Sequence, residues 1–264
     1  MSQVVVIVGA TGGLGGAIAK AYAARGARLA LAARSQDRLQ ALAETLGGET
    51  LVLTADITSA DDLEAVSRAC VEHFGRVDVV VNAAGHDVRR AFLDHSAANI
   101  ERLVTINLMG AIWVTRAFMP VMLTQRSGVI AHLGGFADGR LAFPYYTVDS
   151  AARAGVRGFV DAINREHEGS GVTLTFFCPA PADTDAERPF HALWRSMGTP
   201  IVSPEQVANA LIKAVETRKH VYVMGSATRL FAWINSLSSD LADRLLMRRY
   251  RVLIRDFLGH AIRD

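Results

Sequence analysis

The 264-residue chain has little of several things that mark specialised proteins. It holds only two cysteines, Cys70 and Cys178, and neither has a second cysteine near it at metal-ligand spacing. Its net charge is only +2, so composition gives no electrostatic case for binding nucleic acid. We therefore expect two buried thiols in a reducing compartment, no metal site and no nucleic-acid partner.

Long hydrophobic runs are also missing. No apolar stretch reaches the roughly 18 residues that a membrane span requires. No charged segment followed by an apolar core precedes the first predicted strand, as a signal peptide would need. These features predict a cytoplasmic protein with no integral membrane span, and the length suits one domain with a large core.

The most informative stretch lies at the N-terminus. Residues 3–8 (QVVVIV) form a short, β-branched run that is typical of a buried strand, and the glycine-rich residues 9–16 (GATGGLGG) follow at once. Apolar residues at helical spacing come next. A strand, a glycine-rich turn and a helix open a dinucleotide-binding unit, because glycines let the backbone approach a pyrophosphate and the helix N-terminus offers it free N–H groups.

The spacing of these glycines resembles a known family motif. Gly9-x-x-x-Gly13-x-Gly15 is similar to the T-G-x-x-x-G-x-G motif of the short-chain dehydrogenase/reductase family, with Val8 in place of the usual Thr. The resemblance implies a nicotinamide-dependent oxidoreductase with a small-molecule substrate, and we expect a homo-oligomer, either a dimer or a tetramer. It assigns the cofactor's first contacts to one segment: Gly9, Thr11, Gly12, Gly13, Leu14 and Gly15.

The end of the second predicted strand (28–33) indicates which cofactor is bound. An acidic side chain that binds the ribose 2′-hydroxyl usually stands about 20 residues past the glycines. Here Ala33 is followed by Arg34 and Ser35. A cation beside a hydroxyl suits a 2′-phosphate, so these residues predict NADP(H) over NAD(H).

Strands and helices alternate as far as residue 224. The pattern predicts an α/β fold, a Rossmann-type doubly wound parallel sheet of about seven strands flanked by helices, with the ligand crevice at the strands' carboxyl ends. Asn82-Ala83-Ala84-Gly85 resembles the family's N-N-A-G, and Pro179 with Thr184 resembles its P-G-x-x-x-T. The resemblance therefore adds further cofactor-binding candidates: Asp56, Ile57, Asn82, Ala83, Gly85, Pro179 and Thr184. Asp56 suits a turn before a helix equally well.

The long helix predicted over 99–125 contains one conspicuous polar residue. Asn107 stands in an otherwise apolar run, just before Gly110, and its segment resembles the one that carries the family's catalytic-relay Asn. The pattern predicts an irregularity in the helix, with Asn107 shaping the site.

The family pattern breaks where the chemistry is expected. The strand 128–133 is followed by Gly134-Gly135 where the family has Ser-Ser, and two registers compete for its Y-x-x-x-K signature. Anchoring on Tyr146 puts Ser150 at the Lys position. Anchoring on the downstream helix puts Asp149 at the Tyr position, Arg153 at the Lys position and Gly135 at the Ser position, with one inserted residue near Asp138. We favour the second register because it keeps both flanks in line.

This substitution changes the proton chemistry. In the family, the Tyr hydroxyl exchanges the substrate's proton and the Lys lowers the pKa of that phenol. The pKa of an aspartate is already low and a neighbouring Arg153 would lower it further, so Asp149 would be ionised and unable to protonate a ketone. Asp149 and Arg153 also suit an ordinary (i, i+4) ion pair. Two alternatives stay open for the proton exchange. Tyr145 or Tyr146 could supply a hydroxyl from the same helix face as Asp149, or a desolvated Asp149 with a raised pKa could act as acid or base in enolisation or dehydration.

Three functions follow from these observations. The favoured one is an NADP(H)-dependent oxidoreductase of a carbonyl or hydroxyl substrate, with Asn107, Asp149, Arg153 and Tyr146 as catalytic candidates. The second is an inactive cofactor-binding or regulatory protein. The third is a non-redox lyase or isomerase with Asp149 as its base. We favour the first because a dinucleotide site with Arg34 is hard to explain without a nicotinamide cofactor.

The chain divides into residues 1–225, the dinucleotide-binding and catalytic domain, and residues 226–264, a helical extension of it. An irregular substrate lid is expected at about 185–200. The extension is amphipathic and carries a cluster of arginines: Arg244, Arg248, Arg249, Arg251 and Arg255. Such a helix covers a neighbouring subunit or its own core, or lies on an anionic membrane as a peripheral contact.

Overall fold

The centre of the molecule is one parallel sheet. The computed structural model describes residues 2–135 and 139–260, and within them seven strands are ordered β3-β2-β1-β4-β5-β6-β7. The strands are β1 (Val4–Val8), β2 (Arg28–Ala33), β3 (Thr50–Thr54), β4 (Val79–Asn82), β5 (Gly128–Leu133), β6 (Val172–Cys178) and β7 (Val221–Val223). Each neighbouring pair is parallel, so the predicted doubly wound α/β fold is confirmed.

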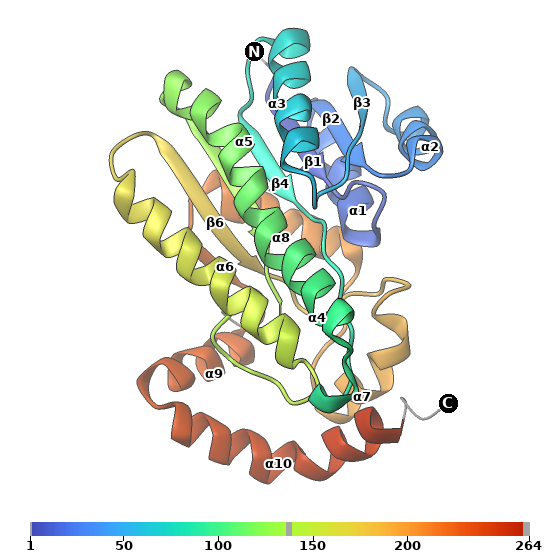
Figure 1. Cartoon of the computed structure of the whole chain (residues 1–264), viewed down its shortest axis with the longest axis vertical. Coiled ribbons are helices and arrows are strands. Elements are labelled where there is room, and N and C mark those ends of the chain that lie inside the picture. The colour runs from blue at the N-terminus through green and yellow to red at the C-terminus, as the bar shows by residue number, and fades with distance from the viewer. Residues whose placement is uncertain (1, 136–138, 261–264) are drawn as a thin grey trace.

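Helices cover both faces of this sheet. One hydrophobic cluster joins the sheet to α3, α5 and α6, which lie in front of it in Figure 1, and a second joins its other face to α1, α2 and α8. The α-helices are α1 (Gly13–Ala23), α2 (Gln36–Leu46), α3 (Ala60–Phe74), α4 (Ala97–Val104), α5 (Gly110–Gln125), α6 (Thr147–Glu166), α7 (His191–Ser196), α8 (Pro204–Glu216), α9 (Ser226–Leu237) and α10 (Ser239–His260). Shorter turns are η1 (Phe92–Asp94), the π-helix η2 (Thr105–Met109) and η3 (Arg188–Phe190). Because the central strands are covered on both sides, they read as unbroken apolar runs rather than alternating ones.

The strand order reverses beside β1. The chain passes from β1 to β2 and β3 on one side, then returns to place β4 on the other side of β1. The carboxyl ends are level, since Val8 pairs with Ala32 of β2 and with Asn82 of β4. The segments that follow β1 and β4 therefore meet at the switch point, where open α/β sheets bind their ligands.

The irregularity predicted around Asn107 is present. The helix is continuous from Ala97 to Gln125, but residues 105–109 form a π-helix that joins α4 to α5. This run is long and apolar enough to cross a membrane by length and composition alone, yet 50% of its most apolar window is buried inside the protein. Val114, Phe118 and Met122 lie in the core, so it is a core helix of the sheet's front layer.

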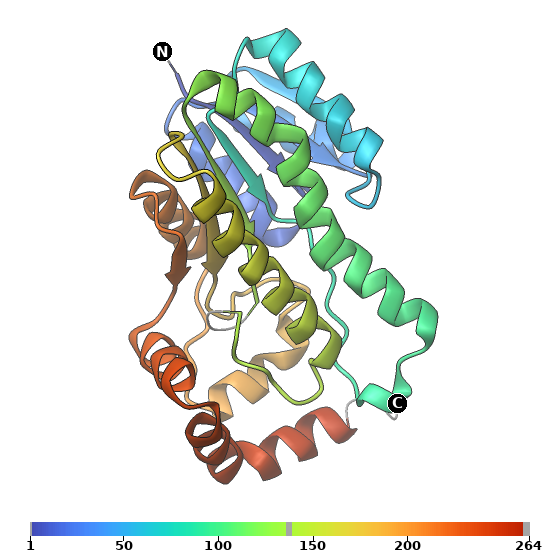
Figure 2. The same ribbon diagram turned by 60° about the vertical axis from the view of Figure 1, so that its left-hand side comes forward.

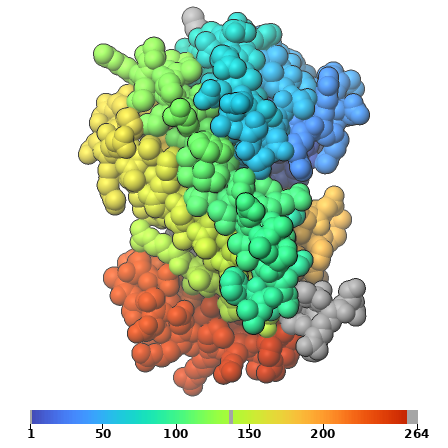
Figure 3. All heavy atoms as spheres, in the orientation of Figure 1, coloured from blue at the N-terminus to red at the C-terminus, as the bar shows by residue number. Residues whose placement is uncertain are grey.

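One prediction about the last third is wrong. Residues 185–199 are not irregular throughout, because η3 and α7 lie there and bury Leu193 and Trp194 in a small cluster. The predicted helical tail is confirmed as two helices, since Ser238 adopts an extended conformation between α9 and α10. Figures 2 and 3 show these two helices across one end of the molecule. Residues 261–264 lie outside the described part of the tail, and the division at residue 225 stays a prediction.

Two leucines give a matched test of this packing. Leu63 is fully buried against the sheet, whereas the side chain of Leu93 on η1 is 90% exposed. We expect Leu63→Ala to lower the free energy of unfolding by about 2–5 kcal/mol, because it leaves a cavity. Leu93→Ala should change it by less than about 0.5 kcal/mol. Urea denaturation followed by circular dichroism measures both, and equal losses would contradict this description of the core.

Candidate active site

The glycine turn after β1 is shaped by close backbone contacts. Gly9 has a φ of +84°, and a Cβ there would lie 2.5 Å from the Ala84 backbone nitrogen of the segment after β4. A Cβ on Gly15 would lie 2.2 Å from the Gly9 carbonyl oxygen. Gly12 caps α1 without any side-chain hydrogen bond to the helix's free N–H groups, and the first turn holds no acidic residue. The turn thus leaves an uncapped helix N-terminus in an open cradle, which fits a pyrophosphate.

A groove of about 470 Å³ runs from this turn along the carboxyl ends of β1, β2 and β4. Nine of the predicted cofactor residues line it: Gly9, Thr11, Gly12, Arg34, Ser35, Asp56, Ile57, Ala83 and Gly85. The other six are not among its lining residues. Gly13, Leu14 and Gly15 open α1, Asn82 is buried at the end of β4, and Pro179 follows β6. Thr184 packs against Gly13, since a Cβ on that glycine would come within 2.8 Å of the Thr184 methyl carbon.

One end of the groove is cationic. Arg38 and Arg102 line it beside the predicted Arg34, and Arg38 donates a hydrogen bond to the carbonyl of Thr11 at 2.7 Å. Asp56 accepts from the Thr58 amide at 2.9 Å, and this bond, with Arg34 and Arg102, lowers the pKa of its carboxyl. Three guanidinium groups beside one carboxylate suit a phosphate group. Sequence reasoning missed Arg38, although it follows Arg34 by four residues, and Arg102.

A buried histidine supports the groove from below. His132 of β5 lies 3.3 Å from the Asn82 amide nitrogen through Nδ1 and 2.9 Å from the Thr115 hydroxyl through Nε2. Thr115 gives its one hydroxyl proton to the Ala111 carbonyl, so we infer that Nε2 donates and Nδ1 accepts. Burial, with Arg153 nearby, lowers the pKa of His132 to about 3 and keeps it neutral. Asn82 is thereby free to accept from the Ala84 amide at 3.2 Å and shape the loop beneath the groove.

Three of the catalytic candidates form one hydrogen-bonded group. The Asp149 Oδ1 accepts from Arg153 Nε at 3.1 Å and from Asn107 Nδ2 at 3.2 Å. Arg153 also donates to the Leu133 carbonyl at 2.8 Å. Asn107, carried on the π-helix, donates to the carbonyl of His86 at 2.6 Å and accepts from its amide at 3.0 Å. The group therefore links α6, η2 and the ends of β4 and β5.

Gly135 and Gly85 stand against this group. A Cβ on Gly135 would lie 3.3 Å from Asp149 Oδ2, so the glycine at the expected serine position faces the carboxylate. A Cβ on Gly85 would lie 2.9 Å from Arg153 Nη2, so the guanidinium reaches the lining of the groove. Ser150, the Lys position of the competing register, instead accepts from the Phe143 amide at 3.4 Å. The insertion expected near Asp138 lies outside the described residues.

Burial raises the pKa of Asp149. Desolvation of a side chain that is only 12% exposed lifts the pKa of its carboxyl above the ordinary value. Arg153 lowers this pKa as expected, but its effect is smaller than that of burial, so the expectation of a net lowered pKa is wrong. The desolvated alternative describes the site: Asp149 is a carboxyl group that holds a proton more readily than a surface aspartate.

The two tyrosines do not join the helix. α6 begins at Thr147, and Tyr145 has a φ of +66°, which prevents an earlier start, so the alternative in which one of them shares Asp149's helix face is wrong. Tyr146 nevertheless lines a cavity of about 30 Å³ together with Asp149 and Trp194. Its buried hydroxyl has no hydrogen-bond partner among residues 2–135 and 139–260, and burial raises its pKa above the usual range.

The comparisons with known proteins assign the family. The family model for short chain dehydrogenases matches residues 3–192. The chain belongs to the short-chain dehydrogenase/reductase family. It is 28% identical to the ketoacyl reductase HetN of a Nostoc species, over 92% of this chain and 88% of that protein. It is equally identical, at 28%, to an uncharacterized oxidoreductase of Staphylococcus epidermidis over 84% of this chain and 94% of that one.

Solved structures agree with this dehydrogenase fold. An actinorhodin polyketide ketoreductase with NADPH superposes with a TM-score of 0.74 at 26% identity, covering 81% of this chain and 90% of that one. A short-chain dehydrogenase/reductase of Burkholderia phymatum in complex with NAD superposes with a TM-score of 0.82 at 24% identity, covering 91% and 95% of the two chains. The latter identity supports the fold alone.

The segment predicted to be the lid of this short-chain dehydrogenase is held by a buried arginine that sequence reasoning missed. The Arg89 side chain is 8% exposed and donates to both carboxylate oxygens of Glu187, at 3.1 and 2.6 Å. It also donates to Asp87 at 2.7 Å and lies 3.6 Å above the Phe190 ring. Trp194 donates its indole N–H to the same glutamate. This latch joins the segment after β4 to η3 and α7, and Trp194 of α7 lines the Asp149 cavity.

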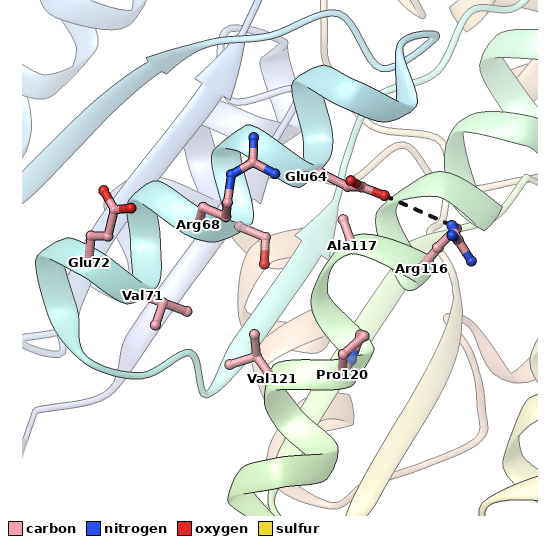
Figure 4. A pocket seen from close by; sticks show the side chains of 9 residues that line it. Glu64, Arg68, Val71, Glu72, Arg116, Ala117, Pro120 and Val121 are labelled. Carbon is pink, nitrogen blue, oxygen red and sulfur yellow. Dashed lines mark ion pairs between the residues drawn. The ribbon is translucent and has the colours of Figure 1, made fainter.

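A larger hollow of about 480 Å³ lies elsewhere, between α3 and α5 (Figure 4). Its charges are mixed, with Arg116 3.9 Å from Glu64 and Arg68 and Glu72 beside them. It brings no buried polar groups to a common point, so it is not the candidate site. Among the residues that the structure describes, no group of three or more His, Cys, Asp or Glu side chains could hold a metal ion.

The latch has a matched control in the same lid. Arg89→Met would leave Glu187 largely buried without its cation, so we expect a loss of about 3 kcal/mol in unfolding free energy and faster proteolysis within residues 183–200. Arg188→Met removes an exposed pair with Asp185 and should have little effect. Urea denaturation and timed proteolysis measure both variants. Similar behaviour of the two would show that Arg89 does not hold the lid.

Proposed function

We propose that this protein is an NADP(H)-dependent oxidoreductase that acts on a carbonyl or hydroxyl group, with Asp149 exchanging the substrate's proton in place of the family's tyrosine. One observation carries the proposal. The groove and the Asp149 group share a boundary, because Gly85 lines the groove and abuts the Arg153 guanidinium, while the adjoining His86 is bonded to Asn107. A dinucleotide site and a buried acid therefore meet in one cleft.

The residues of the groove fit the cofactor. The uncapped N-terminus of α1 would hold the pyrophosphate, and Arg34, Arg38 and Arg102 would hold a 2′-phosphate. A bound nicotinamide cofactor supplies or accepts hydride. The similar actinorhodin polyketide ketoreductase was solved with NADPH and the Burkholderia phymatum protein with NAD, so support for NADP(H) rests chiefly on the arginines.

The chain's own part is to hold and move one proton. Arg153 and Asn107 fix Asp149 through Oδ1, which leaves Oδ2 toward Gly135 for a substrate oxygen. Its raised pKa lets the carboxyl donate a proton when a ketone is reduced and take one when an alcohol is oxidised. Gly135 offers no hydroxyl to polarise the carbonyl, and the loss of one such donor typically lowers the rate about 10²–10³-fold. Slow turnover is therefore expected.

The cavity indicates the substrate's character. Leu141, Phe143 and Trp194 form apolar walls beside Asp149, so we propose an apolar carbonyl or hydroxyl compound. At about 30 Å³ the cavity has room for little more than a water molecule. Entry of substrate therefore needs the lid to move, and the latch at Arg89 must open.

A second candidate is a cofactor-binding protein without turnover. It is favoured by the guanidinium of Arg153, which pairs with Asp149 and fills the space beside Gly85, and by the small size of the cavity. The same buried Asp149 would also serve a non-redox lyase or isomerase as its base. Cofactor binding and deuterium transfer, measured together, distinguish the oxidoreductase, the protein without turnover and the lyase or isomerase.

We also propose a cytoplasmic location and an NADP(H)-bound homo-oligomer, a dimer or a tetramer. Cys70 and Cys178 are buried, and burial raises the pKa of Cys70 to about 12, as in an inert structural thiol. Such thiols suit a reducing compartment. The oligomer stays a prediction.

Cofactor choice is tested at Arg34. Titration of the protein with NADPH and NADH, followed by nicotinamide fluorescence, should show tighter binding of NADPH. Arg34→Ala should weaken NADPH binding about 10–100-fold, because one charge-assisted contact is lost, and leave NADH binding unchanged. Arg188→Ala, at another exposed arginine, is the control. If Arg34→Ala weakened the binding of NADPH and NADH equally, or if neither cofactor bound, this groove would not be the NADP(H) site.

Proton exchange is tested at Asp149. With NADPH deuterated at the transferred position and a panel of apolar ketones, the protein should give deuterated alcohol. Asp149→Asn should lower this rate about 10²–10⁴-fold while NADPH binding persists. The combined variant Gly135→Ser, Asp149→Tyr, Arg153→Lys restores the family's group.

The pattern of results separates the candidates. Cofactor binding with no transfer by the native chain, but transfer by the restored variant, would support the protein without turnover. Conversion of substrate without deuterium, lost in Asp149→Asn, would support the lyase or isomerase. Full activity of Asp149→Asn would remove Asp149 from the chemistry.

A further inference from the structure

Exposed apolar side chains gather at one end of the molecule. The described residues include nine large hydrophobic side chains that are exposed, and all nine belong to η1 or to α9 and α10. Leu93 of η1 is 90% exposed, and Leu237 and Trp233 of α9 are 67% and 59% exposed. Figures 1 and 2 both show η1 at the end of the molecule that α9 and α10 form. A patch this concentrated marks an interaction surface.

The two faces of α10 are distinct. Leu241, Leu245 and Val252 are all exposed and fall within about 40° of one another at 3.6 residues per turn. Leu246 and Ile254 lie on the opposite side and are buried beneath the helix, in the cluster that contains Trp194 of the lid. The outer apolar stripe therefore takes no part in packing α10 against the rest of the protein.

Arginines flank this outer stripe. Arg244, Arg248 and Arg255 run along one side of it and Arg249 along the other, and all four are exposed. Residues 226–260 hold six arginines and three aspartates, so they carry a charge of +3 in a chain whose total is only +2. Asp256, the aspartate nearest the stripe, is paired with Arg255 at 3.0 Å. The end of the molecule is both apolar and cationic.

We propose that η1, α9 and α10 form a docking surface for an anionic lipid membrane. An exposed apolar stripe bordered by arginines is the arrangement of helices that lie in a membrane interface, where anionic headgroups attract the cations. A second copy of the chain is a poorer occupant. A two-fold interface would bring this surface against itself and place the arginines of both copies together.

The docking surface is also the outer side of the lid. Tyr250 of α10 donates a hydrogen bond from its hydroxyl to the carbonyl of Met197 at 3.1 Å, directly after α7. The lid therefore lies between the Asp149 cavity and the proposed membrane. The docking proposal does not depend on the reaction that the site performs.

Vesicle binding tests the proposal. The full-length protein is sedimented with vesicles of phosphatidylcholine alone and of phosphatidylcholine mixed with phosphatidylglycerol, at low and high salt. We expect binding to the anionic vesicles, weak binding to the neutral ones, and loss of binding in high salt. Arg244→Gln with Arg248→Gln, and separately Leu241→Ser with Leu245→Ser, should each weaken binding about tenfold or more.

Matched controls keep the test decisive. Arg68→Gln with Arg116→Gln removes two charges from the hollow between α3 and α5 (Figure 4) and should leave vesicle binding unchanged. Circular dichroism and sedimentation velocity show whether each variant is folded and how it assembles. Absence of binding to anionic vesicles would overturn the proposal. So would a loss of vesicle binding in the control variant as large as the loss in the variants of α10. An assembly that Leu241→Ser with Leu245→Ser dissolves, without vesicle binding, would assign the surface to a second copy.

Discussion

The buried pair between Asp149 and Arg153 is the interaction on which the site depends. Through Arg153 it ties α6 to the end of β5, and through Asn107 it ties the π-helix to the segment after β4. The guanidinium needs Gly85 to have no side chain, and the carboxylate faces Gly135. Because burial outweighs the arginine's attraction, the pair is more than an ordinary helix ion pair: it keeps a carboxyl group whose proton is held more tightly than usual.

The two ends of the cleft have different physical origins. The cofactor end consists mainly of backbone, where Gly9 and Gly15 permit contacts that no side chain would allow, and of arginines at the rim. The chemical end consists of side chains from distant segments, and the residues that depart from the family signature in the favoured register lie there. The backbone beneath the cofactor end is held by Asn82, which His132 orients.

Local signals explain what the sequence could predict. The strand, glycine turn and helix at residues 3–23 are neighbours along the chain, and Asn107 disturbs a single apolar run, so periodicity located both. The latch could not be found this way, since Arg89 and Glu187 are 98 residues apart and either side chain alone is typical of a surface. His132 carried a weak signal as the one polar residue within an apolar strand. Whether the helix had begun before Asp149 stayed open, because Tyr145 adopts a positive φ that its sequence does not require. The direction of the Asp149 pKa depended on burial, which no spacing reports.

The most direct test of the account is a titration of Asp149 itself. Carbon-13 NMR of protein labelled at the aspartate carboxyl carbons, assigned by comparison with Asp149→Asn, gives the pKa of this group. The account predicts a value above the ordinary 3.8 of an aspartate, rising because the side chain is buried. A value below 3.8 would show that Arg153 prevails over burial, and Asp149 would then be a fixed structural anion that could not serve as the proton donor.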